Sequence, residues 1–196
     1  MSSVGRVLYW GNNIPIIVMS LLWLTPMLHF WGAVSGPLRP FSYPDTNVAP
    51  SLPNFLLWFL LSLLPYTLPA WYFTPWLVEQ DGRLYEFLGI RTFKRFVPNG
   101  DLVNRLIRRT DPAYRFLQNR GAAQAFLDKT RSSERGHLVL LFMGIFTAVY
   151  ALRIDWHSWA IGLTIGNVVF NVYPIMLQRY NRLRITRIIQ RGDDKV

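Results

Sequence analysis

Glu134 and His137 are the residues of this chain whose types and spacing most directly suggest chemistry. They stand three positions apart at the start of a long apolar run, so on a helix their side chains share one face. An imidazole with a pKa of about 6.5 can accept a hydroxyl proton at neutral pH, and a neighbouring carboxylate can orient the ring. The pair predicts a general base and its orienting residue, although a solvated pair without a catalytic role would have the same spacing.

A second polar cluster follows the last apolar run, in the sequence QRYNRLR from Gln178 to Arg184. Arginines at this position anchor a helix at the cytoplasmic side of a membrane. The planar guanidinium group also suits a clamp on phosphate or carboxylate, and on a continuing helix Arg179 and Arg182 would share one face. The candidate binding residues around this cluster are Asn171, Gln178, Arg179, Asn181 and Arg182.

Asn167 and Asn171 lie four residues apart inside the last apolar run, so their amides share a helical face. An amide exposed to hydrocarbon is costly, so this face must meet protein or a wet cavity. Hydrogen bonding between helices and contact with a substrate both satisfy that requirement. If the face contacts a substrate, the protein could be a lipid or small-molecule carrier, which is a weaker hypothesis than the two given at the end of this section.

Four apolar stretches approach the length of about 20 residues that a helix needs to cross a membrane. They predict an all-α integral membrane protein, a single membrane domain over residues 1–196 with two helical hairpins joined by a cytoplasmic interfacial block. The predicted spans are residues 14–34, 55–77, 137–152 and 158–177, the block covers residues 78–135, and a tail covers residues 178–196. The first span lacks a cleavage pattern, so we expect it to remain as a helix.

Basic residues are distributed very unequally between the two sides of this topology. The N-terminus, the block and the tail hold 19 of the 21 Lys and Arg residues, and the connections between paired spans hold two, Arg39 and Arg153. This bias predicts that both termini and the block are cytoplasmic. The net charge of +10 is therefore explained by membrane orientation and attraction to anionic lipids, and no nucleic-acid partner is expected.

The local pattern predicts several features of these segments. Three prolines, Pro65, Pro69 and Pro75, should kink the second span, and the proline-rich link over residues 35–53 should be an external loop. In the block, short strand-like runs such as RLYEFLGI are possible, VPNGD predicts a turn, and residues 113–129 have helical spacing. A new helix could begin with a cap at Ser132 or Ser133.

The absence of cysteine limits the chemistry. Disulfides, thiolate metal sites and a thioester acyl-enzyme are excluded, so acyl transfer would use an oxygen nucleophile or proceed directly from the donor. One E-x-x-H motif is too little for a dimetal bundle, which needs two such motifs and further carboxylates. We expect neither a metal nor a cofactor.

The sequence NVYPIMLQRYNRLRI resembles the C-terminal signature of the glycosyl-4,4'-diaponeurosporenoate acyltransferase family, membrane enzymes that esterify a carotenoid glycoside with a fatty acyl chain. The E-x-x-H of Glu134 and His137 agrees in order, as does an acid-x-x-Gly segment followed by a basic-aromatic run and a Pro/Gly turn. That segment is matched by Glu79, Gly82, Phe93, Lys94, Pro98 and Gly100. The resemblance covers about residues 77–184.

The resemblance implies an O-acyltransferase in which His137 and Glu134 serve catalysis, while Glu79, Lys94 and the cluster around Arg179 bind substrate. Its expected partners are membrane lipids, an acyl donor such as acyl-CoA, and a glycosylated carotenoid or lipid acceptor. The expected location is a bacterial cell membrane. The alternative is a non-catalytic subunit of a membrane complex, whose aromatic faces pack pigments, lipids or partner chains.

Overall fold

The computed structural model describes residues 3–35, 52–76, 79, 81–117 and 119–193, and the regular elements in these ranges are all helical. The chain forms two compact units. Residues 20–69 and 135–174 form the first, which we call the apolar unit. Residues 1–19, 70–134 and 175–196 form the second, the basic unit, which holds 18 of the 21 Lys and Arg residues. The short strand-like runs allowed for the central block are wrong for its described part, where RLYEF is helix α4.

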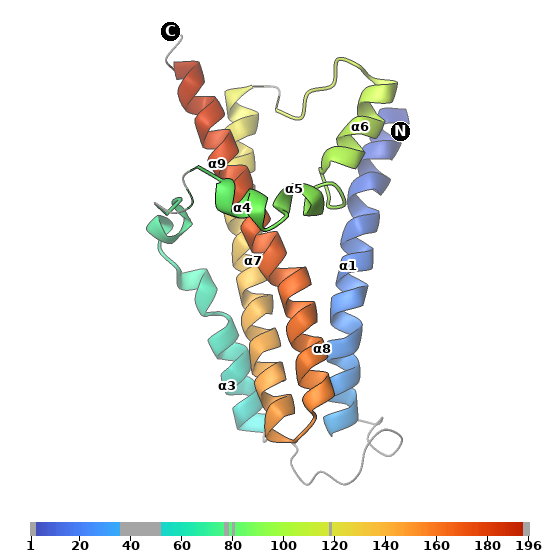
Figure 1. Ribbon diagram of the computed structural model, residues 1–196, viewed down its shortest axis with the longest axis vertical. Helices are drawn as coiled ribbons and strands as arrows, with labels where there is room; N and C mark the ends of the chain where they lie inside the picture. The colour runs from blue at the N-terminus through green and yellow to red at the C-terminus, as the bar shows by residue number, and fades with distance from the viewer. Residues whose placement is uncertain (1–2, 36–51, 77–78, 80, 118, 194–196) are drawn as a thin grey trace. The chain divides into compact units, whose positions relative to one another are not determined.

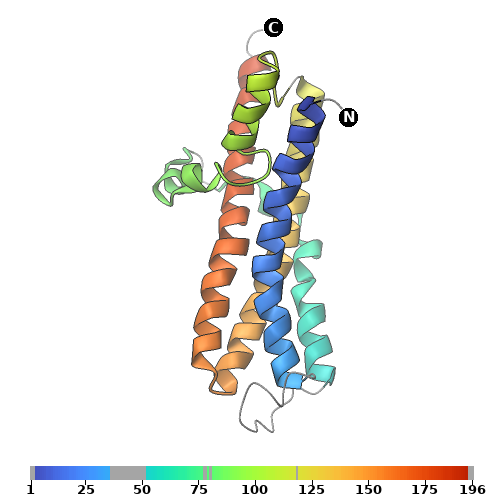
Figure 2. The same cartoon turned by 90° about the vertical axis from the view of Figure 1, so that its right-hand side faces the viewer.

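Three helices are long and apolar enough to cross a membrane. The first is α1 (Ser3–Ser35), which is uninterrupted (Figure 2). The second is α7 (Arg120–Arg153), and the third runs from His157 to Gln190 through α8 (His157–Asn167), the π-helical segment η4 (Val168–Val172) and most of α9 (Tyr173–Asp193). The predicted spans 14–34, 137–152 and 158–177 all lie inside these helices. The structure is consistent with an integral membrane protein.

The predicted second span, residues 55–77, is not one continuous helix in the structure. Helix α3 (Leu52–Ser62) ends before two 3₁₀ turns, η1 (Leu64–Thr67) and η2 (Ala70–Phe73). Pro65 and Pro69 cannot donate a backbone hydrogen bond, and their rings clash with the preceding helical turn. The prolines therefore end the α-helix where a kink was predicted, and a fourth membrane-length helix is not found among the described residues.

The prediction of a new helix start at Ser132 or Ser133 is wrong. Helix α7 begins at Arg120 and passes through both serines without a break. The polar run from Thr130 to Arg135 supplies no glycine or proline, so nothing in it stops a helix. The predicted external loop over residues 35–53 lies almost wholly outside the described residues.

The apolar unit has an aromatic core. Phe30 is fully buried and packs edge-on against Tyr150 and Trp156, while Trp31 stacks on Tyr150 at 5.5 Å between ring centroids. Helices α7 and α8 form the predicted antiparallel hairpin through a tight turn in which Asp155 has a φ of 59° (Figure 1). Aromatic pairs contribute about 0.5–1.5 kcal/mol each beyond their buried area.

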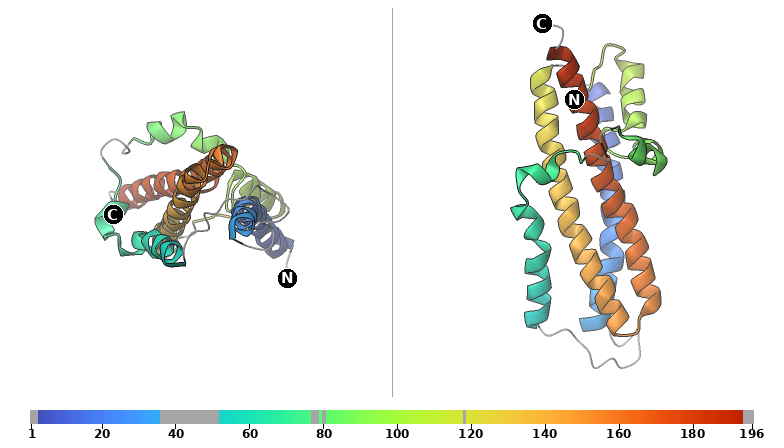
Figure 3. Two further views of the ribbon diagram at one scale, coloured as in Figure 1. Left: turned by 90° about the horizontal axis from the view of Figure 1, so that it is seen from below. Right: turned by 60° about the vertical axis from the view of Figure 1, so that its left-hand side comes forward.

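In the basic unit, short helices pack against longer ones. Helix α4 (Arg83–Phe87) contacts α9 through the rings of Tyr85 and Tyr180, and α5 (Ile90–Phe93) follows it (Figure 1). Helix α6 (Asp101–Thr110) approaches α1 where a Cβ on Gly11 would stand 3.1 Å from Val103. The first half of α7 runs beside α9 with Leu127 and Ile185 in a shared core (Figure 3).

Candidate functional site

The polar cluster of the apolar unit joins His137 on α7 to Asn171 and Asn167 on the opposing helix. The Nδ1 atom of His137 lies 3.5 Å from Oδ1 of Asn171. The amide nitrogen of Asn171 donates to Oδ1 of Asn167 at 2.7 Å, and the amide nitrogen of Asn167 donates to the Leu141 carbonyl at 2.9 Å. Asn171 is fully buried and Asn167 is 3% exposed, so hydrogen bonding satisfies amides that would otherwise be costly inside the protein.

This chain of contacts determines which atoms of His137 can act. Because the amide nitrogen of Asn171 is directed to Asn167, its oxygen faces the imidazole. An amide oxygen can only accept, so it pairs with a proton on Nδ1 of His137. The neutral ring then carries its basic lone pair on Nε2. The arrangement gives a half-buried histidine whose Nδ1 faces the Asn171 oxygen, and the backbone of Phe170 is a second hydrogen-bond partner of the ring.

A local distortion of the helix places Asn171. Pro174 cannot donate to the carbonyl four residues earlier, and its ring crowds that carbonyl. The helix widens into the π-helical segment Val168–Val172 just before this proline. Such π-helical insertions occur frequently at functional sites. On the other side of the cluster, a Cβ on Gly144 would stand 2.6 Å from the Asn167 side chain, so α7 approaches Asn167 closely only because residue 144 is glycine.

The basic unit contains a different cluster, made of two carboxylates and two guanidinium groups. Arg179 donates from Nε to Glu134 at 2.9 Å and from Nη1 to both oxygens of Glu79 at 2.8 and 3.0 Å. Its Nη2 donates to the Tyr72 carbonyl at 2.9 Å. Arg182 donates from Nη2 to the second oxygen of Glu134. All four side chains are buried, and their formal charges cancel.

Aromatic rings enclose this ionic cluster. The guanidinium carbon of Arg179 lies 4.9 Å from the Tyr72 ring centroid and 4.6 Å from that of Trp76, and Arg182 lies 5.8 Å from the Phe73 ring. Contacts of this kind stabilise a cation by about 0.5–2 kcal/mol. Tyr72, Phe73 and Trp76 therefore pack on the two arginines of the cluster.

Within this cluster, Nε and Nη1 of Arg182 are buried without a hydrogen-bond partner in the described part of the chain, and so is the hydroxyl of the neighbouring Tyr85. Burial raises the pKa of the Tyr85 hydroxyl well above its ordinary value, and the nearby Glu79 carboxylate acts in the same direction. Tyr85 is therefore a neutral, buried donor.

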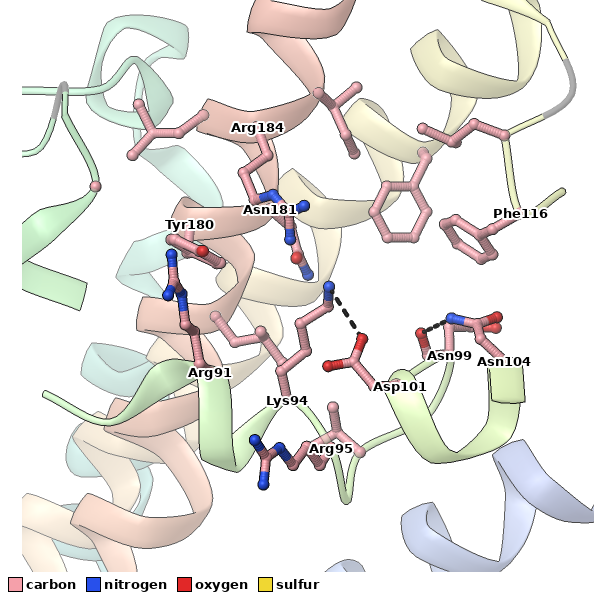
Figure 4. A pocket seen from close by; sticks show the side chains of 18 of the residues that line it. Arg91, Lys94, Arg95, Asn99, Asp101, Asn104, Phe116, Tyr180, Asn181 and Arg184 are labelled. Carbon is pink, nitrogen blue, oxygen red and sulfur yellow. Dashed lines mark hydrogen bonds and ion pairs between the residues drawn. The ribbon is translucent and has the colours of Figure 1, made fainter. Parts of the chain in front are cut away.

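These contacts place the predicted site residues in three groups. His137 and Asn171 belong to the cluster of the apolar unit, whereas Glu79, Glu134, Arg179 and Arg182 belong to the ionic cluster. Glu134 accepts hydrogen bonds from Arg179 and Arg182. Its partners are therefore these two arginines, whereas the spacing in the sequence suggested His137. Lys94 and Asn181 line a groove of the basic unit (Figure 4), and Gln178 is half-buried on α9.

Sequence reasoning missed several members of these clusters. Asn167 was noted for its spacing but not as the residue that holds Asn171, and Tyr72 and Trp76 were not connected with Arg179. The YP dipeptide at residues 173 and 174 was the available signal for the local helix distortion, since proline inside an apolar helix frees a carbonyl. No local signal could pair Glu79 with an arginine 100 positions away.

The described residues form a helical protein with membrane-length helices and a polar cluster that contains His137. A family model identifies the family. Residues 69–191 match the model of the glycosyl-4,4'-diaponeurosporenoate acyltransferases, so the chain belongs to that family. The match covers both clusters and the groove. No curated protein and no solved structure matches the chain.

Proposed function

We propose that the protein transfers a fatty acyl chain to a hydroxyl group of a glycosylated carotenoid or related lipid, with Nε2 of His137 as the general base. The family supplies the reaction type. The observation that carries the residue assignment is the contact between Nδ1 of His137 and the Asn171 oxygen, because it leaves the opposite nitrogen unprotonated. General bases contribute roughly 10²- to 10⁴-fold to a rate.

The proposed reaction is a direct transfer. Nε2 of His137 accepts the hydroxyl proton while the hydroxyl oxygen attacks the acyl carbonyl carbon of the donor. The bond between that carbon and the donor's leaving group then breaks, and the imidazolium returns the proton to the leaving group. The chain has no cysteine, so a cysteine thioester plays no part in this mechanism.

In this mechanism the orienting residue is Asn171, which takes the role that spacing alone suggested for Glu134. An asparagine can hold one imidazole tautomer because its oxygen accepts from Nδ1–H. It provides no negative charge to stabilise the imidazolium, so the ring returns its proton readily. Glu134 instead binds Arg179 and Arg182.

The proposed location is a bacterial cell membrane, with the N-terminus, the central block and the tail in the cytoplasm. The support is the distribution of basic residues, 19 on that side and two on the other. An acyl donor such as acyl-CoA is available on the cytoplasmic side. Reporter fusions after Lys129 and at Asp45 test this topology: the first is expected in the cytoplasm and the second outside, and a central block found outside would contradict it.

The test of the catalytic proposal compares two histidines of the apolar unit. His137→Ala is expected to lower formation of the acylated glycoside at least 100-fold, measured by mass spectrometry of lipids from cells that make the glycoside acceptor. His157→Ala is the control, because His157 is exposed at the start of α8, with its Nδ1 2.9 Å from the Asp155 carbonyl oxygen. Membrane levels of both variants are measured in parallel.

Wild-type product formation by His137→Ala at equal membrane abundance would contradict the general-base assignment. Equal product in cells with and without the protein would contradict the acyltransferase proposal as a whole. In that case, co-purification with a larger membrane complex would favour the non-catalytic subunit.

A further inference from the structure

The basic unit contains a groove that neither cluster uses, which we call the cationic groove. It has a volume of about 800 Å³ and is lined by residues of the segment of α4, α5 and α6 and by residues of α9 (Figure 4). Its charged lining residues are Arg91, Lys94, Arg95, Arg108, Arg184 and Arg187, with Asp81, Glu86 and Asp101. The groove therefore has a formal charge of +3, and its volume falls within the range of small-molecule sites.

The excess charge resides in identifiable side chains. Arg91 pairs with Glu86 at 2.6 Å and Lys94 with Asp101 at 3.4 Å. Arg95, Arg108 and Arg184 make no ion pair with any described residue, although Arg184 lies 5.7 Å from the Tyr180 ring. These three guanidinium groups are available to an anionic ligand, and each can bind a phosphate through two parallel hydrogen bonds.

A tight turn carries the wall of the groove that includes Lys94 and Asp101. Asn99 has a φ of 55°, and its backbone nitrogen donates to the Asn12 side chain at 2.6 Å. A Cβ on Gly100 would clash with the backbone carbonyls of Lys94 and Val97, so only glycine fits this position. The turn is thus held in one conformation, and the basic side chains project from a fixed backbone.

The opposite part of the groove is apolar. Phe116 and Phe126 contact each other edge to face with ring centroids 4.9 Å apart, and Leu117, Ile185 and Ile188 extend the same wall. A single lipid phosphate would use the cations but not this wall. A ligand that carries several phosphates and a flat ring would use both, because the ring can stack on an aromatic face.

We propose that the cationic groove binds the soluble, phosphorylated head of the acyl donor, a nucleotide-type group with several phosphates. The identification of the ligand as an acyl donor rests on the proposed function. Arg95, Arg108 and Arg184 bind its phosphates, and Phe116 contacts its ring. Arg179 is excluded from this role because each of its nitrogens already donates within the ionic cluster.

The experiment measures binding without turnover. Protein in nanodiscs of uncharged phosphatidylcholine is titrated with radiolabelled coenzyme A, which has the phosphorylated head but no acyl chain. Saturable binding is expected for the wild type, and Arg95→Gln with Arg184→Gln is expected to weaken it at least tenfold. The matched control is Arg83→Gln with Arg109→Gln, which removes the same charge from exposed positions outside the groove and is expected to change binding less than twofold.

Three results would overturn the proposal. The first is no saturable binding, and the second is equal weakening in both double variants. The third is loss of coenzyme A binding when the protein is placed in nanodiscs that contain anionic phosphatidylglycerol. The last result would identify the occupant as a lipid headgroup. His137→Ala separates this proposal from the proposed function, because it is expected to bind coenzyme A like the wild type while forming no ester. If the wild type binds coenzyme A but neither it nor any variant forms the ester, the proposed function is contradicted and the binding of a phosphorylated head in the groove is not.

Discussion

The two polar clusters of this protein use buried groups in opposite ways. In the ionic cluster, both carboxylate oxygens of Glu134 and all three nitrogens of Arg179 have partners, and opposite charges cancel. In the apolar unit, the chain of uncharged amides ends at an imidazole whose Nδ1 faces the Asn171 oxygen. A cluster of paired opposite charges resists change, whereas one that ends in an imidazole can take up a proton. We therefore expect the first cluster to contribute to stability and propose the second as the place of the chemistry.

The largest effect is expected when the ionic cluster loses a charge. Arg179→Ala leaves the buried carboxylates of Glu79 and Glu134 without their shared partner, which should cost about 3–5 kcal/mol of stability. Arg131→Ala is the control, because Arg131 forms an exposed pair with Asp128 at 3.0 Å and such pairs contribute about 0–1 kcal/mol. The fraction of protein that stays monodisperse in detergent after heating measures both. Equal heat resistance of the two variants would contradict the structural role of the ionic cluster.

A smaller and more specific effect is expected in the amide chain. The Cβ added by Gly144→Ala would meet the Asn167 side chain at 2.6 Å, so Asn167 must move and release Asn171 and His137. Acyl transfer should fall about tenfold or more, since small misplacements of catalytic groups are costly, while heat resistance changes much less than in Arg179→Ala. Gly162→Ala in α8 is the control, as its Cβ would meet nothing within 4 Å. If both alanine variants transfer acyl chains equally, Asn167 does not position His137.

The smallest effect concerns Tyr85, the buried donor beside the ionic cluster. Because burial raises the pKa of its hydroxyl in the folded state, the neutral form is favoured there. Its contribution to stability is complete below the unfolded value of about 10 and is lost as the pH rises toward the folded pKa. Between pH 10 and 11, the free energy of unfolding of the wild type should therefore fall by on the order of 1 kcal/mol more than that of Tyr85→Phe. Identical pH profiles of heat resistance would show that this hydroxyl does not titrate with unfolding.

Much of the helical architecture could be predicted from local sequence. Apolar runs of sufficient length predicted the three membrane-length helices found in the described part of the chain, and the turn between residues 153 and 157 forms the expected hairpin. The end of the second helix was harder to predict, because a hydropathy pattern counts apolar residues and ignores backbone hydrogen-bond donors. Pro65 and Pro69 remove such donors, so the α-helix ends at Ser62 although the apolar sequence continues.

By itself the sequence determined that the protein is helical, rich in apolar helices, basic in its central block and tail, and a member of a family of acyltransferases. Only the tertiary structure decided what each polar residue contacts. Spacing places Glu134 and His137 on one helical face, but their partners lie 45, 48 and 34 positions away. Spacing constrains neighbours on one helix, whereas charges and amides in an apolar interior pair with whichever groups the packing of other helices brings within hydrogen-bond distance.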